Sequence, residues 1–268
     1  MRVSTAVMRS ARAEWIRTAG AGRLWTVLAP AAVLTPLAIS VGIAAVAEAF
    51  ARIPGQLSVL QVPTSNAGYW VITITLTLVA IAAADGQSSE NRYRTAEYIR
   101  LAIRSRWSVP VGRWLFYGLL GAALAAVTMV IVLAALPVVS TRVYGTVSVA
   151  DPVGLRLVWT TTVLGFFAAG AGIGVGALVR SPLGAGAVIV AWTYVVETAA
   201  GYLPGGLAAQ RFMPALNGGY AAGQDTVLIP PWSPNIALLY VCALCAVAFG
   251  VGVAGSASMT PTKGRSVE

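Results

Sequence analysis

The sequence contains no histidine and only one lysine, Lys263. The absence of histidine excludes a Ser-His-Asp triad, histidine general acid–base catalysis, and histidine-ligated zinc or haem. The lysine lies in TPTKGRS, which lacks the glycine-rich approach of a phosphate-binding loop. We therefore predict a chain with no catalytic residues, no metal ligands, no cofactor of its own and no nucleotide-hydrolysis site.

Charged residues are also scarce: they make up 10% of the chain, against about a quarter of a typical soluble domain, while 57% of the chain is hydrophobic. The net charge of +9 comes from short basic segments that flank apolar runs, a pattern that indicates membrane topology and not nucleic-acid binding. Nine scattered acidic residues make a membrane enzyme such as a lipid transferase a weak alternative, because such sites need clustered ligands.

Cysteine occurs only twice, at Cys242 and Cys245, as a C-x-x-C within an apolar run. A redox motif needs a thiolate in a partly exposed, polar setting. We therefore interpret the two cysteines as small packing residues one helical turn apart.

What the sequence has in quantity is apolar runs long enough to cross a bilayer. They predict an all-α integral membrane protein with a single transmembrane domain of six helices, at 24–50, 68–84, 114–139, 155–179, 183–203 and 236–257. Pro30 and Pro36 are expected to kink the first span. Segment 204–235 is too rich in glycine and proline to span, and it predicts one or two short helices on the outer side.

Positive charge sets the predicted orientation. With both termini inside, fourteen of the 18 lysine and arginine residues fall on the cytoplasmic side and four outside. Cytoplasmic segments carry such an excess, so we expect cytoplasmic termini. The bias toward arginine over lysine suggests a GC-rich bacterial genome, and therefore a bacterial cytoplasmic membrane. In 1–23 the apolar residues Val7, Met8, Ala11 and Trp15 share one helical face, which predicts an interfacial helix on the inner leaflet.

Between the second and third spans, the loop at 85–113 carries six arginines and three acidic residues. Apolar and aromatic side chains recur on one helical face from Tyr93 through Ile99 and Ile103 to Trp107. A cytoplasmic amphipathic helix of this kind either docks a soluble partner or lies as a basic connector on anionic lipid. Periodicity alone leaves both alternatives open.

The fourth span contains GAGIGVG, in which Gly170 and Gly174, and Gly172 and Gly176, form small-xxx-small pairs. Such pairs permit close contact between membrane helices. No strand precedes them, so we interpret the glycines as helix packing and not as a nucleotide loop.

Two carboxyl groups lie within predicted spans and are candidates for translocation or gating. Glu197 follows Tyr194 by one turn in the fifth span, and Glu48 lies near the outer end of the first. Charged groups within spans are costly and are functional candidates by default. For Glu197, structural hydrogen bonding and a functional role remain equally open.

The order of these elements resembles the ABC-2 type permease family, the membrane subunits of type V ABC exporters. The resemblance is carried by Glu90, the Arg94-Thr95 pair, the amphipathic helix at 96–107 and Arg113, and by ALVRSPLGAGAVIVAWTYVVE at 177–197. The order of the elements matches the family over nearly the whole chain. Arg94 replaces the common glycine of the family, and the proline expected before the third span is shifted to Pro110.

The resemblance implies a dimeric exporter permease with a second copy or paralogue, each subunit in the lipid bilayer binding a stand-alone ABC ATPase. ATP and Mg²⁺ would bind the partner ATPase. The residues implied to couple to it are Glu90, Tyr93, Arg94, Thr95, Ile99 and Ile103. An ion-coupled secondary transporter or channel without an ATPase is the main alternative, and a structural subunit without transport activity is another.

Overall fold

The computed structural model describes residues 3–19, 22–53, 61–92 and 107–258. Within these ranges the chain is helical and contains no strand. The described part includes six helices that are long and apolar enough to cross a membrane, which indicates a multi-pass membrane protein. They are Leu24–Ala51, Thr64–Ser89, Ser108–Val139, Pro152–Val179, Pro182–Ala200 and Pro234–Ser256.

The first half of the chain begins with α1 (Val3–Thr18), which packs against the start of α6. The first span consists of a short π-helix, η1 (Leu24–Leu28), and the α-helix α2 (Ala29–Ala51). The label η marks π-helical segments throughout. The second span consists of α3 (Thr64–Ala67), η2 (Val71–Thr75) and α4 (Leu76–Arg92). The third is the single helix α6 (Ser108–Val139).

The second half begins with α7 (Pro152–Val179), the fourth span. The fifth span is divided into α8 (Pro182–Val190), η3 (Ala191–Val196) and α9 (Glu197–Ala200). Two short helices follow, α10 (Gly206–Gln210) and α11 (Pro214–Ala222), before the last span, α12 (Pro234–Ser258). The predicted non-spanning segment at 204–235 therefore contains both short helices.

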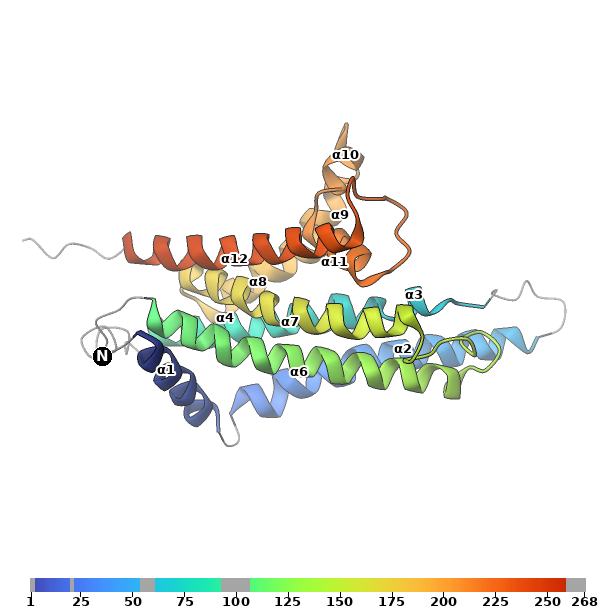
Figure 1. Ribbon diagram of the computed structural model, residues 1–268, viewed down its shortest axis with the longest axis horizontal. Helices are drawn as coiled ribbons and strands as arrows, with labels where there is room; N and C mark the ends of the chain where they lie inside the picture. The colour runs from blue at the N-terminus through green and yellow to red at the C-terminus, as the bar shows by residue number, and fades with distance from the viewer. Residues whose placement is uncertain (1–2, 20–21, 54–60, 93–106, 259–268) are drawn as a thin grey trace, which may run out of the picture.

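The bundle has two ends, which we name after the helices that mark them. The α1 end carries α1, the end of α4, the start of α6 and the end of α12 (Figure 1). The α11 end carries α11, α3, the end of α6 and the start of α12.

The two largest extensions beyond the predicted span boundaries are both at the α1 end. The α4 helix continues past Asp85 to Arg92, and α6 begins at Ser108, six residues before the expected start at Trp114. Pro110 lies in the first turn of α6, where a missing N–H costs no intrahelical hydrogen bond. On α4, the change from apolar to polar residues at Asp85 marks the end of the apolar run but not the end of the helix.

The α7 helix lies at the centre of the bundle and contacts α4, α6 and α12. Its glycines face other backbones: Gly172 and Gly176 lie against the carbonyls of Ala80 and Ala84 on α4, and Gly174 lies against that of Ala248 on α12. Gly170 instead lies against the indole of Trp114. Because a Cβ at any of these positions would overlap its neighbour, glycine allows three helices to approach α7 closely.

Candidate functional site

A buried ion pair joins α1 to α6 at the α1 end. The Glu14 carboxylate accepts a hydrogen bond from Arg113 Nε at 2.6 Å, and the two side chains are 5% and 3% exposed. Charged groups are buried in this way only when they are paired. Glu14 and Arg113 are 99 positions apart in the sequence, so the pair holds α1 against the first helical turns of the third span.

Arg17 extends the pair toward α4. Its Nε and Nη2 donate to Glu14 Oε2 at 2.9 and 2.6 Å, and its Nη1 donates to Ser89 Oγ at 2.9 Å. Its Nη2 also lies 3.4 Å from the Tyr117 hydroxyl on α6. Burial lowers the pKa of the Arg17 guanidinium, but the attraction of Glu14 outweighs it and leaves that pKa above its usual value. Arg17 therefore stays charged.

The α4 helix joins the same network through its polar last turns. Arg113 Nη1 donates to Gln87 Oε1 at 2.9 Å, and Arg23 lies 3.8 Å from Asp85. Gly86 accommodates the ring of Tyr117, which a Cβ at that position would overlap. The end of α4 and the start of α6 are thus connected to each other and to α1.

Close packing reinforces the polar contacts between α1 and α6. Gly112 of α6 lies against Ser10 of α1, whose hydroxyl donates to the Val109 carbonyl at 3.3 Å. Trp15 of α1 makes edge-to-face contacts with Trp25 and Phe116, with ring centroids 6.1 and 6.2 Å apart. We call the set Glu14, Arg17, Gln87, Ser89, Arg113 and Tyr117 the α1 clamp.

The contacts of the α1 clamp position helices, and its side chains are not arranged as a catalytic or metal site. Its carboxylate and guanidinium groups are occupied by one another, and within the described chain no group of three potential ligands could hold a metal ion. Removing one member of a buried ion pair typically costs about 3–5 kcal/mol, although the intact pair adds little net stability. The pair therefore specifies how α1 meets α4 and α6.

The residues implied to couple to an ATPase lie in the last turns of α4 and in the chain that follows it. Glu90 is in the last turns of α4, which end at Arg92. Tyr93, Arg94, Thr95, Ile99 and Ile103 lie outside the described residues. The coupling assignment of these positions stays a prediction.

At the α11 end, Glu48 is 5% exposed and holds the end of α2 against the α6–α7 connection. Its carboxylate accepts from Ser140 Oγ at 3.0 Å, from the Arg142 backbone N–H at 3.1 Å, and from Arg52 Nη2 at 3.2 Å. These contacts describe a tie between two segments, and they leave its predicted gating role untested.

Glu197 is 6% exposed and makes a tie of the same kind. Its carboxylate accepts the Ala215 backbone N–H at 2.8 Å, in the first turn of α11, where a negative charge is favoured. Tyr194 makes a separate contact, its hydroxyl donating to the Thr73 carbonyl of η2 at 3.3 Å. Glu48 and Glu197 have different partners, so the structure does not combine the three gating candidates into one site.

Of the α1 clamp, sequence analysis singled out only Arg113; it did not single out Glu14, Arg17, Gln87, Ser89 or Tyr117. The available signal was that Glu14 is the one acidic residue among the five arginines of segment 1–23. The two cysteines lie where small packing residues are expected. Cys242 of α12 belongs to an apolar cluster that also includes Leu164 and Ala221, and Cys245 packs against that cluster.

No protein-family model matches the chain, and no curated protein matches it.

Proposed function

We propose that the chain is the membrane-spanning permease subunit of a bacterial ATP-binding cassette exporter, driven by ATP hydrolysed on a separate ATPase subunit. The observation that carries this proposal is the α1 clamp. It joins α1 to the two helices that lead into and out of segment 93–106, the segment predicted to contact the ATPase.

The charge distribution supports a cytoplasmic position for the α1 end. Fourteen of the 18 lysine and arginine residues belong to the N-terminal segment, the 85–113 segment, the turn at Arg180 and the C-terminal tail. Positive charge in short connecting segments stays on the cytoplasmic side. A soluble ATPase in the cytoplasm would then meet this end of the bundle.

The lengths of the helices support a lever. The α6 helix has 32 residues, which corresponds to about 48 Å at 1.5 Å per residue, whereas the hydrocarbon core is about 30 Å thick. The α4 helix also continues without a break to Arg92. A displacement of segment 93–106 would therefore move the second and third spans as rods, with α1 braced against both.

The partners of the proposed exporter follow from what the chain offers. No phosphate-binding loop occurs in the sequence, so ATP and Mg²⁺ belong to the ATPase. Only 17% of the residues in the most apolar part of the fifth span are buried within the chain, which leaves most of its apolar side chains to lipid or to a second permease copy or paralogue.

The ion-coupled transporter is the weaker reading because of where the buried carboxylates lie. Such carriers bind their ions near the bilayer midplane. The two buried carboxylates of the described spans, Glu48 and Glu197, are both at the α11 end, and each accepts backbone or hydroxyl hydrogen bonds.

Co-purification with the stand-alone ATPase tests the proposal. Arg94→Glu or Ile99→Asp should abolish ATPase capture while the chain still inserts in the membrane. Arg211→Glu, an exposed arginine on the α10–α11 connection, is the matched control and should leave capture unchanged. Unchanged capture by the Arg94 and Ile99 variants would contradict the docking assignment, and transport without any ATPase would favour the ion-coupled alternative.

A further inference from the structure

The first span contains a proline, Pro36, within α2. Proline has no backbone N–H, so the carbonyl of Ala32, one turn earlier, lacks its usual donor in the helix, and the proline ring also crowds that carbonyl. The second span supplies a donor: Thr75 Oγ1 donates to the Ala32 carbonyl at 2.8 Å, and Thr75 is fully buried. A hydrogen bond between two spans therefore replaces one that the first span cannot make by itself.

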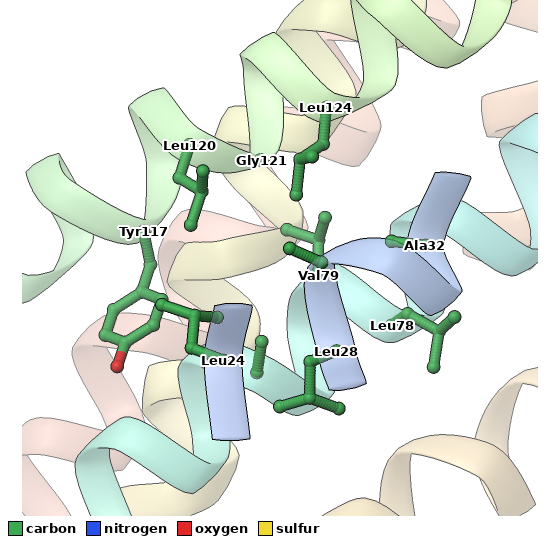
Figure 2. Close-up of a pocket in the computed structure, with 11 residues that line it drawn as sticks. Leu24, Leu28, Ala32, Leu78, Val79, Tyr117, Leu120, Gly121 and Leu124 are labelled. Carbon is green, nitrogen blue, oxygen red and sulfur yellow. The ribbon is translucent and has the colours of Figure 1, made fainter. Parts of the chain in front are cut away.

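The surroundings of Ala32 are apolar. Figure 2 shows Ala32 at a narrow space between three spans, with Leu78 and Val79 of α4 on one side and Leu124 of α6 on another. The side chains of these neighbours carry no hydrogen-bond donor. Because a buried carbonyl without a partner is costly in such surroundings, Thr75 stabilises the proline-containing turn.

Two apolar clusters meet at the depth of this hydrogen bond. Leu28 of the first span and Val79 of the second are buried in a cluster that lies toward the α1 end. Ala44 of the first span and Ile72 of the second are buried in another cluster, toward the α11 end. On both spans, the residues joined by the hydrogen bond lie between the two clusters. The first span is therefore packed as two parts, one on each side of its proline.

The backbone differs among the spans at this depth. The third and fourth spans, α6 and α7, are continuous α-helices here, and the proline inside α6, Pro137, lies near its far end. The second span is instead π-helical from Val71 to Thr75, and α4 begins at Leu76. Segments of π-helix interrupt the regular hydrogen-bond ladder and occur frequently at functional sites. The irregular backbone is thus shared by the two spans that the hydrogen bond joins.

We propose that Pro36 is a hinge of the first span and that the hydrogen bond from Thr75 to Ala32 holds the hinge in the conformation of the structure. When this bond breaks, segment 37–51 changes its angle to segment 24–32. Prolines bend helices in this way because the missing intrahelical bond lowers the resistance to bending. The hinge does not depend on the exporter assignment, since it requires only the contact between the first two spans.

Double electron–electron resonance of the full chain in lipid nanodiscs tests the hinge. Spin labels are placed at Val27→Cys or Val46→Cys, two exposed positions on opposite sides of the hinge, and each is paired with a label at Val127→Cys on α6. The chain used for labelling has both native cysteines replaced by alanine.

Removing the hydroxyl should change one distance only. We expect Thr75→Val to raise the ratio of bent to unbent molecules about tenfold, because the loss of one buried hydrogen bond shifts an equilibrium by about that factor. The distance distribution from Val46 should therefore broaden or shift, whereas that from Val27 should stay the same.

Three further variants distinguish a hinge from a general loss of packing. Thr75→Ser keeps the hydroxyl and should behave as the unmodified chain. Thr77→Val removes a buried hydroxyl that donates within its own helix, to the Thr73 carbonyl at 2.7 Å, and should change neither distance. Pro36→Ala restores an N–H for the Ala32 carbonyl, so Thr75→Val should have no effect in that background.

Three results would overturn the proposal: an unchanged Val46 distance in Thr75→Val, an equal change in the Val27 distance, or the same change in the Pro36→Ala background. If Thr75→Val alone does not fold, recovery of the folded chain by Pro36→Ala would support the hinge hydrogen bond, and failure to recover would contradict it.

Discussion

The two ends of the bundle both bury carboxylates, but they satisfy them in different ways. At the α1 end, Glu14 is bound by the guanidinium groups of Arg113 and Arg17. At the α11 end, Glu48 and Glu197 accept backbone N–H groups, from Arg142 and Ala215, and the guanidinium that also reaches Glu48, that of Arg52, is 67% exposed.

The difference concerns which parts of the chain each contact holds together. A carboxylate on a backbone N–H holds a fixed feature of the chain, such as the first turn of α11. A buried ion pair holds two side chains from distant helices, and its geometry is specific while its net contribution to stability is small. The α1 end is therefore held by a buried pair of side chains from distant helices, whereas the α11 end is held mainly through backbone N–H groups.

The largest effect is expected from breaking the α1 clamp. Glu14→Leu removes the carboxylate that accepts hydrogen bonds from Arg113 and Arg17, and should destabilise the protein by about 3–5 kcal/mol. Thermal unfolding in detergent measures the loss. The double variant Glu14→Leu/Arg113→Met should recover most of it, since neither charge then remains; losses that simply add would mean that the pair is not coupled.

Glu48→Ala should have a smaller effect at the α11 end. It leaves the buried Ser140 hydroxyl and the Arg142 N–H without their acceptor, at a cost of about 1–3 kcal/mol. No second substitution can remove the backbone N–H, so, unlike at the α1 end, replacing Ser140 by alanine should restore only part of the loss. Full rescue in the same unfolding assay would contradict the contrast between the two ends.

Glu197→Gln should cost less again, about 0.5–1.5 kcal/mol, because the amide oxygen still accepts the Ala215 N–H but without a charge at the α11 N-terminus. Hydrogen exchange should increase in α11 and leave α1 unchanged. In a transport assay we predict that Glu197→Gln lowers transport more than expression. Equal losses of transport and expression would indicate a folding role.

The smallest effect concerns alkaline pH. Burial raises the pKa of Tyr144, on the α6–α7 connection, above its usual value of about 10. The folded state therefore favours the neutral phenol, so the stabilisation is complete below pH 10 and is lost as pH rises through the higher pKa of the folded state. Tyr144→Phe should reduce this loss in unfolding scans between about pH 9 and 11; an identical profile would show that the partly buried phenol has no raised pKa.

Much of the fold could be predicted from the sequence because hydropathy is a local property. The six spans, the short helices within 204–235 and the glycines of α7 follow from apolar runs, broken segments and small-residue spacing. The helix ends at the α1 end could not be predicted in this way. Asp85 marks a change from apolar to polar residues and Pro110 lacks a backbone N–H, but neither residue ends a helix.

The candidate site was only partly predictable. Glu197 and Glu48 stood out because a charge in an apolar run is visible along the chain, but their partners, Ala215 and the Ser140–Arg142 segment, lie on other elements. The predicted coupling positions from Tyr93 to Ile103 lie outside the described residues, so that assignment still depends on periodicity and resemblance.

By itself, the sequence determined that the chain is a helical membrane protein without histidine chemistry, because composition and the length of apolar runs do not depend on packing. Only the tertiary structure decided that Glu14 pairs with Arg113 and that α1 joins α4 to α6. The physical reason is that a buried charge needs a partner of opposite charge within hydrogen-bonding distance, and a partner 99 residues away is selected by the packing of helices.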